Sequence, residues 1–104
     1  MILKNQASES DEWQFGRGKL PIQAAFRRAG DIRPLLHAHR TLHEYFYIIR
    51  GELTVAVEDR RVRLRADDFL IVEPGERHTA SEPSDDLLLL IIMERGREGD
   101  KVVY

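Results

Sequence analysis

Residues 37–51 read HAHRTLHEYFYIIRG, and this stretch decides the fold. If His37 and His39 lie on one strand, their side chains project to the same face, so both imidazoles reach one ion. Glu44, expected on the next strand, completes a mixed nitrogen and oxygen ligand set. A fourth ligand from a distant strand would close the site from the opposite side.

A second stretch, DFLIVEPGERH at residues 68–78, contains a Pro-Gly turn and ends on His78. Together the two stretches resemble the paired motifs of the cupins. In the first motif of that family two His and one Glu bind a metal and a Gly ends the strand; His37, His39, Glu44 and Gly51 occupy the matching positions here. The second motif delivers the third His, and here Asp67 stands where it usually begins with Gly.

The resemblance implies an all-β fold, a double-stranded β-helix or jelly-roll barrel of two antiparallel sheets whose open end holds the metal and a pocket. It implies one divalent transition metal ion held by His37, His39, Glu44 and His78. Ligand type leaves Fe, Mn, Ni, Zn and Cu open. Because His43 is adjacent to Glu44, we expect it on the exterior or at an interface, and as the substitute ligand if Glu44 is turned away.

Short apolar segments broken by turn residues follow Pro21 and predict strands of a sandwich or barrel. These segments are residues 22–28, 45–50, 52–57, 61–65, 69–72 and 87–93. Glu58-Asp59 is typical of a hairpin turn between two of them. Residues 1–20 are expected to form an N-terminal arm or edge strand, and residues 21–104 a single cupin domain.

Composition narrows the function classes. With 104 residues and a net charge of -2, the chain is one domain with no expected attraction to nucleic acid. The alternating arginines of residues 61–65 are interpreted as a solvent face, neutralised by Glu58, Asp59, Asp67 and Asp68. The absence of Cys excludes thiolate ligands. No stretch is typical of a membrane span or a signal peptide, so no membrane partner and a cytoplasmic location are expected.

Two runs are apolar at nearly every position, residues 45–49 and 87–93. A strand in a sheet with one solvent-exposed face should alternate apolar and polar residues. Because these two runs do not alternate, both faces of their strands are expected to be covered. Since a chain of this size has little left to cover the outer face, the pattern predicts a homodimer formed through it.

Two hypotheses for function remain open. In the first, a small molecule binds at the ion and undergoes isomerase, lyase or dioxygenase chemistry. Catalytic residues are not identified, and Gln23, Arg28 and Glu73 are candidates at the pocket mouth. In the alternative, a non-catalytic cupin binds or senses a ligand and acts through a partner protein.

Overall fold

Nine strands and one short 3-10 turn make up the part of the chain that the structure, a computed structural model, describes: residues 21–94 and 99–104. The predicted N-terminal arm lies outside the described residues. The elements are β1 (Ile22–Arg28), η2 (Ala29–Asp31), β2 (His37–His39), β3 (Glu44–Arg50), β4 (Glu52–Val57), β5 (Arg60–Arg65), β6 (Phe69–Val72), β7 (His78–Ser81), β8 (Leu88–Glu94) and β9 (Lys101–Val103).

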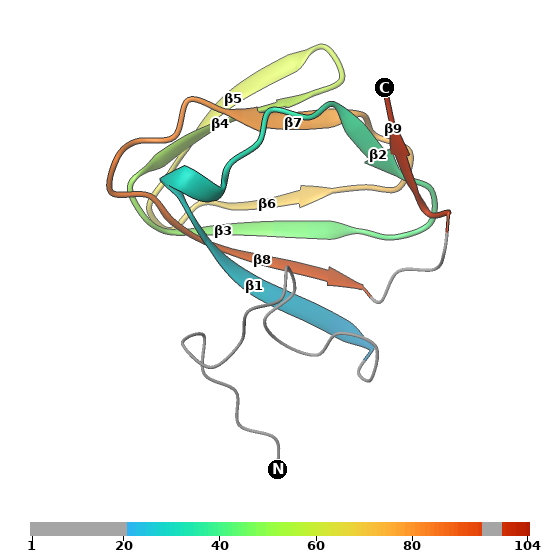
Figure 1. Ribbon diagram of the computed structural model, residues 1–104, viewed down its shortest axis with the longest axis horizontal. Coiled ribbons are helices and arrows are strands. Elements are labelled where there is room, and N and C mark those ends of the chain that lie inside the picture. Colours follow the sequence, from blue (N-terminus) through green and yellow to red (C-terminus); the bar gives the residue numbers. More distant parts are fainter. Residues whose placement is uncertain (1–20, 95–98) are drawn as a thin grey trace.

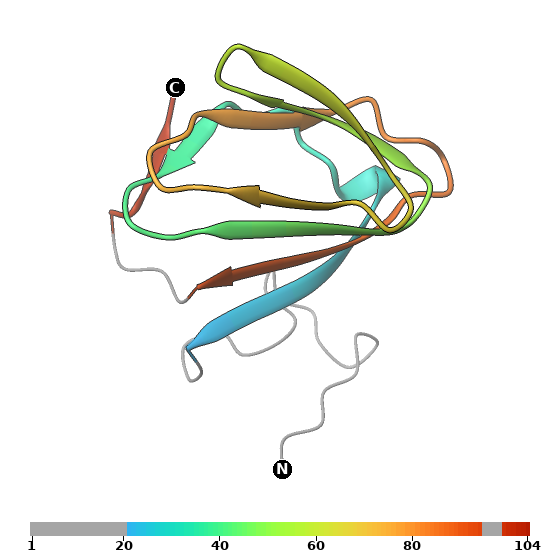
Figure 2. The ribbon, with the colours of Figure 1, turned by 180° about the vertical axis from the view of Figure 1, so that it is seen from behind.

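The strands form two antiparallel sheets packed face to face (Figures 1 and 2). One sheet has the order β1-β8-β3-β6 and the other the order β5-β4-β7-β2-β9. Strands distant in sequence are neighbours, with β1 beside β8 and β2 beside β9. This arrangement confirms the expected double-stranded β-helix. The described residues contain no helix that could span a bilayer.

The core lies between the two sheets and follows the period of two along each strand. Phe46 and Ile48 of β3, Leu89 of β8, and Leu53 and Val55 of β4 are buried inward. The intervening outward residues of β3 and β8 are only half-buried or exposed. The apolar runs therefore cover the core with one face and leave a partly exposed apolar face on the outside of the sheet.

Among the described residues, three that are not glycine adopt the left-handed region of backbone conformation: Glu58, Asp67 and Glu82. Glu58, with a φ of 52°, begins the two-residue turn between β4 and β5, which confirms the predicted hairpin. Asp67 has a φ of 73°, and Asp is one of the few residues apart from Gly that tolerate this region. Its carboxylate also accepts a hydrogen bond from the Tyr47 hydroxyl at 2.7 Å. Asp67 thus adopts a backbone conformation that glycine favours.

The arginine face of β5 is neutralised, but by different acids from those expected. Arg61 pairs with Glu82 at 2.9 Å and Arg63 with Glu52 at 3.2 Å. Glu52 lies on the adjacent β4, and Glu82 directly follows β7, the strand on the other side of β4. Two of the predicted partners, Glu58 and Asp67, make other contacts. Glu58, for example, accepts from the backbone N–H of Arg77.

Candidate metal centre

The four predicted ligands come together at one end of the barrel. Their candidate ligand atoms all lie within 4.8 Å of one another. His37 of β2 is directly opposite His78 of β7, so these two residues of different motifs are cross-strand neighbours. Glu44 belongs to β3 in the other sheet. The expected roles are therefore exchanged: His78 is on the strand next to His37 and His39, and Glu44 closes the site from the opposite sheet.

Two of the three histidines are held by a hydrogen bond at Nδ1. His37 Nδ1 lies 2.8 Å from the carbonyl oxygen of Leu35, and His78 Nδ1 lies 3.0 Å from that of Glu76. Because a carbonyl only accepts, both Nδ1 atoms carry a proton. His39 Nδ1 instead faces a carboxylate oxygen of Asp100 at 3.4 Å. The Nε2 atoms of His39 and His78 both lie 3.2 Å from Glu44.

Neighbouring imidazoles favour a negative Glu44 despite its burial. Burial alone would raise the pKa of Glu44, but the contacts with His39 and His78 outweigh burial and lower the pKa to about 2. Burial lowers the pKa of His37, more than its bond to the Leu35 carbonyl raises it. For His78 burial also acts downward, yet the contact with Glu44 and the Glu76 carbonyl raise its pKa. The site thus combines a carboxylate with imidazoles whose Nε2 atoms face it.

The residues present fit a transition metal ion. His39 Nε2 is buried and makes no hydrogen bond to any described residue, although Glu44 Oε2 is only 3.2 Å away. A buried polar nitrogen without a hydrogen bond is costly unless something else binds it. Three imidazoles and one carboxylate match the preferences of several divalent metals equally well. The structure therefore supports a site that could hold an ion without identifying the ion.

His43 lies outside this cluster, as expected from its position beside Glu44. Its side chain is 42% exposed, and Nδ1 lies 2.9 Å from a carboxylate oxygen of Glu94. The ring stacks on Tyr45, one of the outward residues of β3. Since Glu44 faces the cluster, no substitute ligand is needed.

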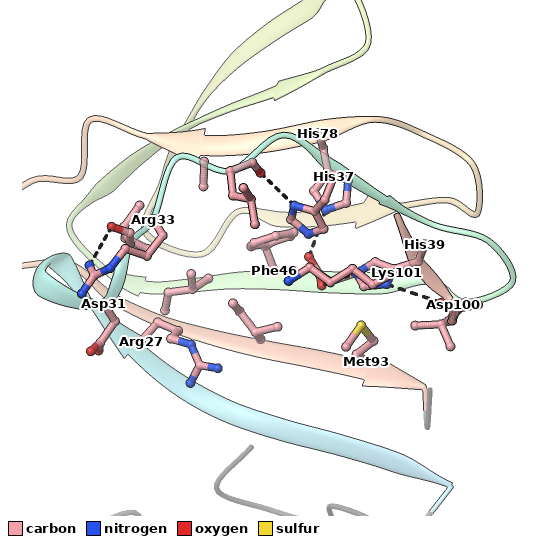
Figure 3. Close-up of a pocket in the computed structure, with 17 residues that line it drawn as sticks. Arg27, Asp31, Arg33, His37, His39, Phe46, His78, Met93, Asp100 and Lys101 are labelled. Atoms are coloured by element: carbon pink, nitrogen blue, oxygen red, sulfur yellow. Dashed lines mark hydrogen bonds and ion pairs between the residues drawn. The ribbon is translucent and has the colours of Figure 1, made fainter. Parts of the chain in front are cut away.

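The cluster opens into a cavity of about 440 Å³ between the two sheets (Figure 3). Basic residues line it together with the ligands and apolar side chains: Arg27, Arg33 and Lys101. The suggested catalytic candidates Gln23, Arg28 and Glu73 are not among the residues that line it. Sequence patterns missed the basic residues and Asp100 because only the folded arrangement of strands and connecting segments brings them to the cavity. Lys101, for example, is opposite His39 in the β2–β9 pair.

Comparison with known proteins agrees with the observed fold. Residues 28–93, well over half of the chain, match the cupin domain family. The chain is a cupin. The fold of this cupin is similar to that of PAC13 from Streptomyces, solved with uridine and described as a nucleoside dehydratase, with a TM-score of 0.77. The two are 13% identical, and the match covers 100% of this chain and 90% of PAC13.

Two other proteins share parts of this cupin. The tetracenomycin polyketide synthase protein TcmJ of Streptomyces glaucescens is 43% identical over 42 residues. That match covers 40% of this chain and only 28% of TcmJ. An oxalate decarboxylase from Lactobacillus farciminis has a TM-score of 0.61 at 21% identity, over 80% of this chain and 26% of the decarboxylase. These structural likenesses establish the cupin fold.

Proposed function

We propose that this cupin is a metal-dependent enzyme that acts on a small organic molecule bound beside one divalent transition metal ion. The observation that carries the proposal is the convergence of His37, His39, Glu44 and His78 within 4.8 Å, at the inner end of a cavity. Such an ion would supply Lewis-acid or redox chemistry of the isomerase, lyase or dioxygenase type.

The chain's own residues perform the binding and the positioning. The carbonyl groups of Leu35 and Glu76 fix the rings of His37 and His78, so little rotamer freedom is lost when a ligand binds. Phe46 packs edge-on against His78, with ring centroids 6.4 Å apart. It forms part of an apolar wall that keeps water away from the inner end of the cavity. A small molecule in the cavity therefore meets a rigid, partly desolvated site.

The likeness to a nucleoside dehydratase and a decarboxylase supports testing lyase chemistry first, since both of those activities remove a group without hydrolysis. The alternative of a non-catalytic sensing cupin shares the same metal site. It differs in predicting stoichiometric binding of a ligand without turnover.

Metal analysis tests the proposal directly. Protein purified without chelator, or reconstituted with Fe, Mn, Ni or Zn, is expected to bind about one ion per chain, measured by plasma mass spectrometry after desalting. His78→Ala and His37→Ala should each lose most of the metal, because removing one of four ligands leaves the set incomplete. His43→Ala removes a histidine outside the cluster, so this variant should retain the metal.

Failure of the wild-type protein to bind any of these metals would refute the proposal. If metal binds, turnover is followed with diketones, phenols and sugar phosphates, together with oxygen uptake. Ligand binding without turnover across that panel would favour the sensing function instead.

A further inference from the structure

The two ends of the cavity differ in chemistry. Figure 3 shows His39 and Asp100 at one end, and Arg27, Asp31 and Arg33 at the other. Arg27 is brought inward by strand pairing: it is opposite the buried Leu89 of β8 and shares the inward face of β1 with Ala25. Arg33 belongs to the segment between η2 and β2, which also borders the cavity.

Strand register gives the distance between the ends. Leu89 also pairs with Ile48 of β3, so Arg27 lies in the same row of the sheet as Ile48. Ile48 is four residues beyond Glu44, which is about 13 Å along the strand. Side chains project into the cavity from both ends and shorten the remaining span. A molecule of two fused rings matches this span and fits within about 440 Å³.

The wall between the two ends is apolar. It is formed by Ile32, Leu35, Phe46, Ala80, Leu89 and Ile91. A polyhydroxylated sugar lying against this wall would lose hydrogen bonds to water without replacing them. A flat or alkyl body loses nothing in the same place and gains by burial. The middle of the cavity therefore selects for a hydrophobic body.

At the arginine end of the cavity two guanidinium groups, those of Arg27 and Arg33, lie near one carboxylate, that of Asp31. Within the described residues Arg33 forms no ion pair and donates only to the carbonyl groups of Gly30 and Ile32. The carboxylates that line the cavity are already engaged. Asp31 accepts from the N–H of Arg28 at 2.8 Å, and Asp100 from Thr41.

We infer that the ligand of this cavity is an organic anion with an apolar body, whose polar group lies at the histidine cluster and whose carboxylate or other anionic group lies between Arg27 and Arg33. This inference rests on the proposed function for the role of the inner end only. The arginine end and the apolar wall are independent of any ion. A guanidinium is well suited to hold a carboxylate, because its planar donors match the two oxygens.

Three probes separate the contribution of the anionic group to binding from that of the apolar body. The first is a hydroxynaphthoate whose hydroxyl and carboxylate lie at opposite ends of the two rings; the second is the matching naphthol; the third is a hexose phosphate. In titration calorimetry of the metal-loaded protein, hydroxynaphthoate should bind most tightly, naphthol less tightly and hexose phosphate most weakly. A difference of about tenfold is expected between the first two, as for one charge-assisted hydrogen-bonded pair.

Matched arginine variants test which end of the cavity binds the anionic group of the ligand. Arg33→Gln and the double variant with Arg27→Gln should reduce the preference for hydroxynaphthoate over naphthol, the double variant to about twofold or less. Arg28→Gln, an exposed neighbour that does not line the cavity, should leave the preference unchanged. Arg33 is itself exposed, so Arg33→Gln is expected to fold normally even if the double variant does not.

Any of four results would overturn the inference. They are equal affinity for hydroxynaphthoate and naphthol, a preference that the arginine variants do not change, tightest binding of the hexose phosphate, and no binding of any probe. The same titrations on metal-free protein separate it from the proposed function. If the chain binds no metal but still prefers the anion through Arg33, the proposed function fails and this inference stands.

Discussion

At the residue scale, Asp100 is the side chain that a ligand motif does not reveal. Its Oδ1 accepts from the backbone N–H of Thr41 at 2.9 Å and from the Thr41 hydroxyl at 2.6 Å, which fixes the carboxylate. Its Oδ2 is left facing His39 Nδ1, and both side chains are about 95% buried. A carboxylate behind an imidazole orients the ring and makes it a stronger ligand.

Asp100→Asn is therefore expected to weaken metal affinity about tenfold or more, because it removes the negative charge behind His39 while preserving size. Competition with a chromophoric chelator measures the affinity. The absorption spectrum of the cobalt-loaded protein should shift, which a loss of stability alone would not cause.

Glu94→Gln is the matched control, since Glu94 contacts Nδ1 of His43, a histidine outside the cluster. It should leave affinity and spectrum unchanged. If the two variants had the same metal affinity and the same cobalt spectrum, the positioning role of Asp100 would be contradicted.

The four clustered residues were predictable from sequence because the spacing within each motif is local and the two motifs resemble the paired motifs of the cupins. Asp100 was not, because it acts through the pairing of β2 with β9 across about 60 intervening residues. The exchanged positions of Glu44 and His78 have the same origin. Spacing within a motif states which residues share a face, whereas sheet order decides which strands are neighbours.

At the scale of the elements, the turn between β3 and β4 depends on Gly51. Its φ is 81°, in the left-handed region that favours glycine. A Cβ there would lie 2.6 Å from Ser84 Oγ and 2.8 Å from the backbone Cα of Leu87. The loop before β8 thus packs directly against this turn, and Leu87 is fully buried beside it.

Gly51→Ala is expected to destabilise the protein by about 2 kcal/mol or more, through backbone strain and the displacement of the loop before β8. Urea unfolding followed by circular dichroism measures the change. Gly30→Ala is the control, because a Cβ at Gly30 meets nothing within 4 Å. A Gly51→Ala protein as stable as the Gly30→Ala protein would show that the loop moves aside at no cost.

At the scale of the whole molecule, the outer face of the β1-β8-β3-β6 sheet is a continuous apolar surface. Tyr47 of β3 is opposite both Phe69 of β6 and Leu90 of β8, and Tyr45 is opposite Ile71 of β6. Phe69 and Ile71 are 54% and 49% exposed. A surface of this kind on a small domain is typical of an interaction site. We propose that a second copy of the chain covers it.

Light scattering at micromolar concentration is expected to give twice the chain mass of 12.1 kDa. Phe69→Glu and Ile71→Glu should shift the protein to the monomer, because each places a charge within the apolar face. Leu36→Glu, at an exposed apolar residue outside this sheet, should leave the dimer intact. A monomeric wild-type protein would refute the homodimer.

The four candidate ligands are divided between the two sheets, with the histidines on one and Glu44 on the other. An ion bound to all four would act as a crosslink between the layers at that end of the barrel. Any fluctuation that parts the layers would have to break a coordination bond, so the amide protons of β2 and β3 should exchange more slowly with solvent when the ion is present. Release of the ion and opening of the barrel at that end would then be coupled equilibria.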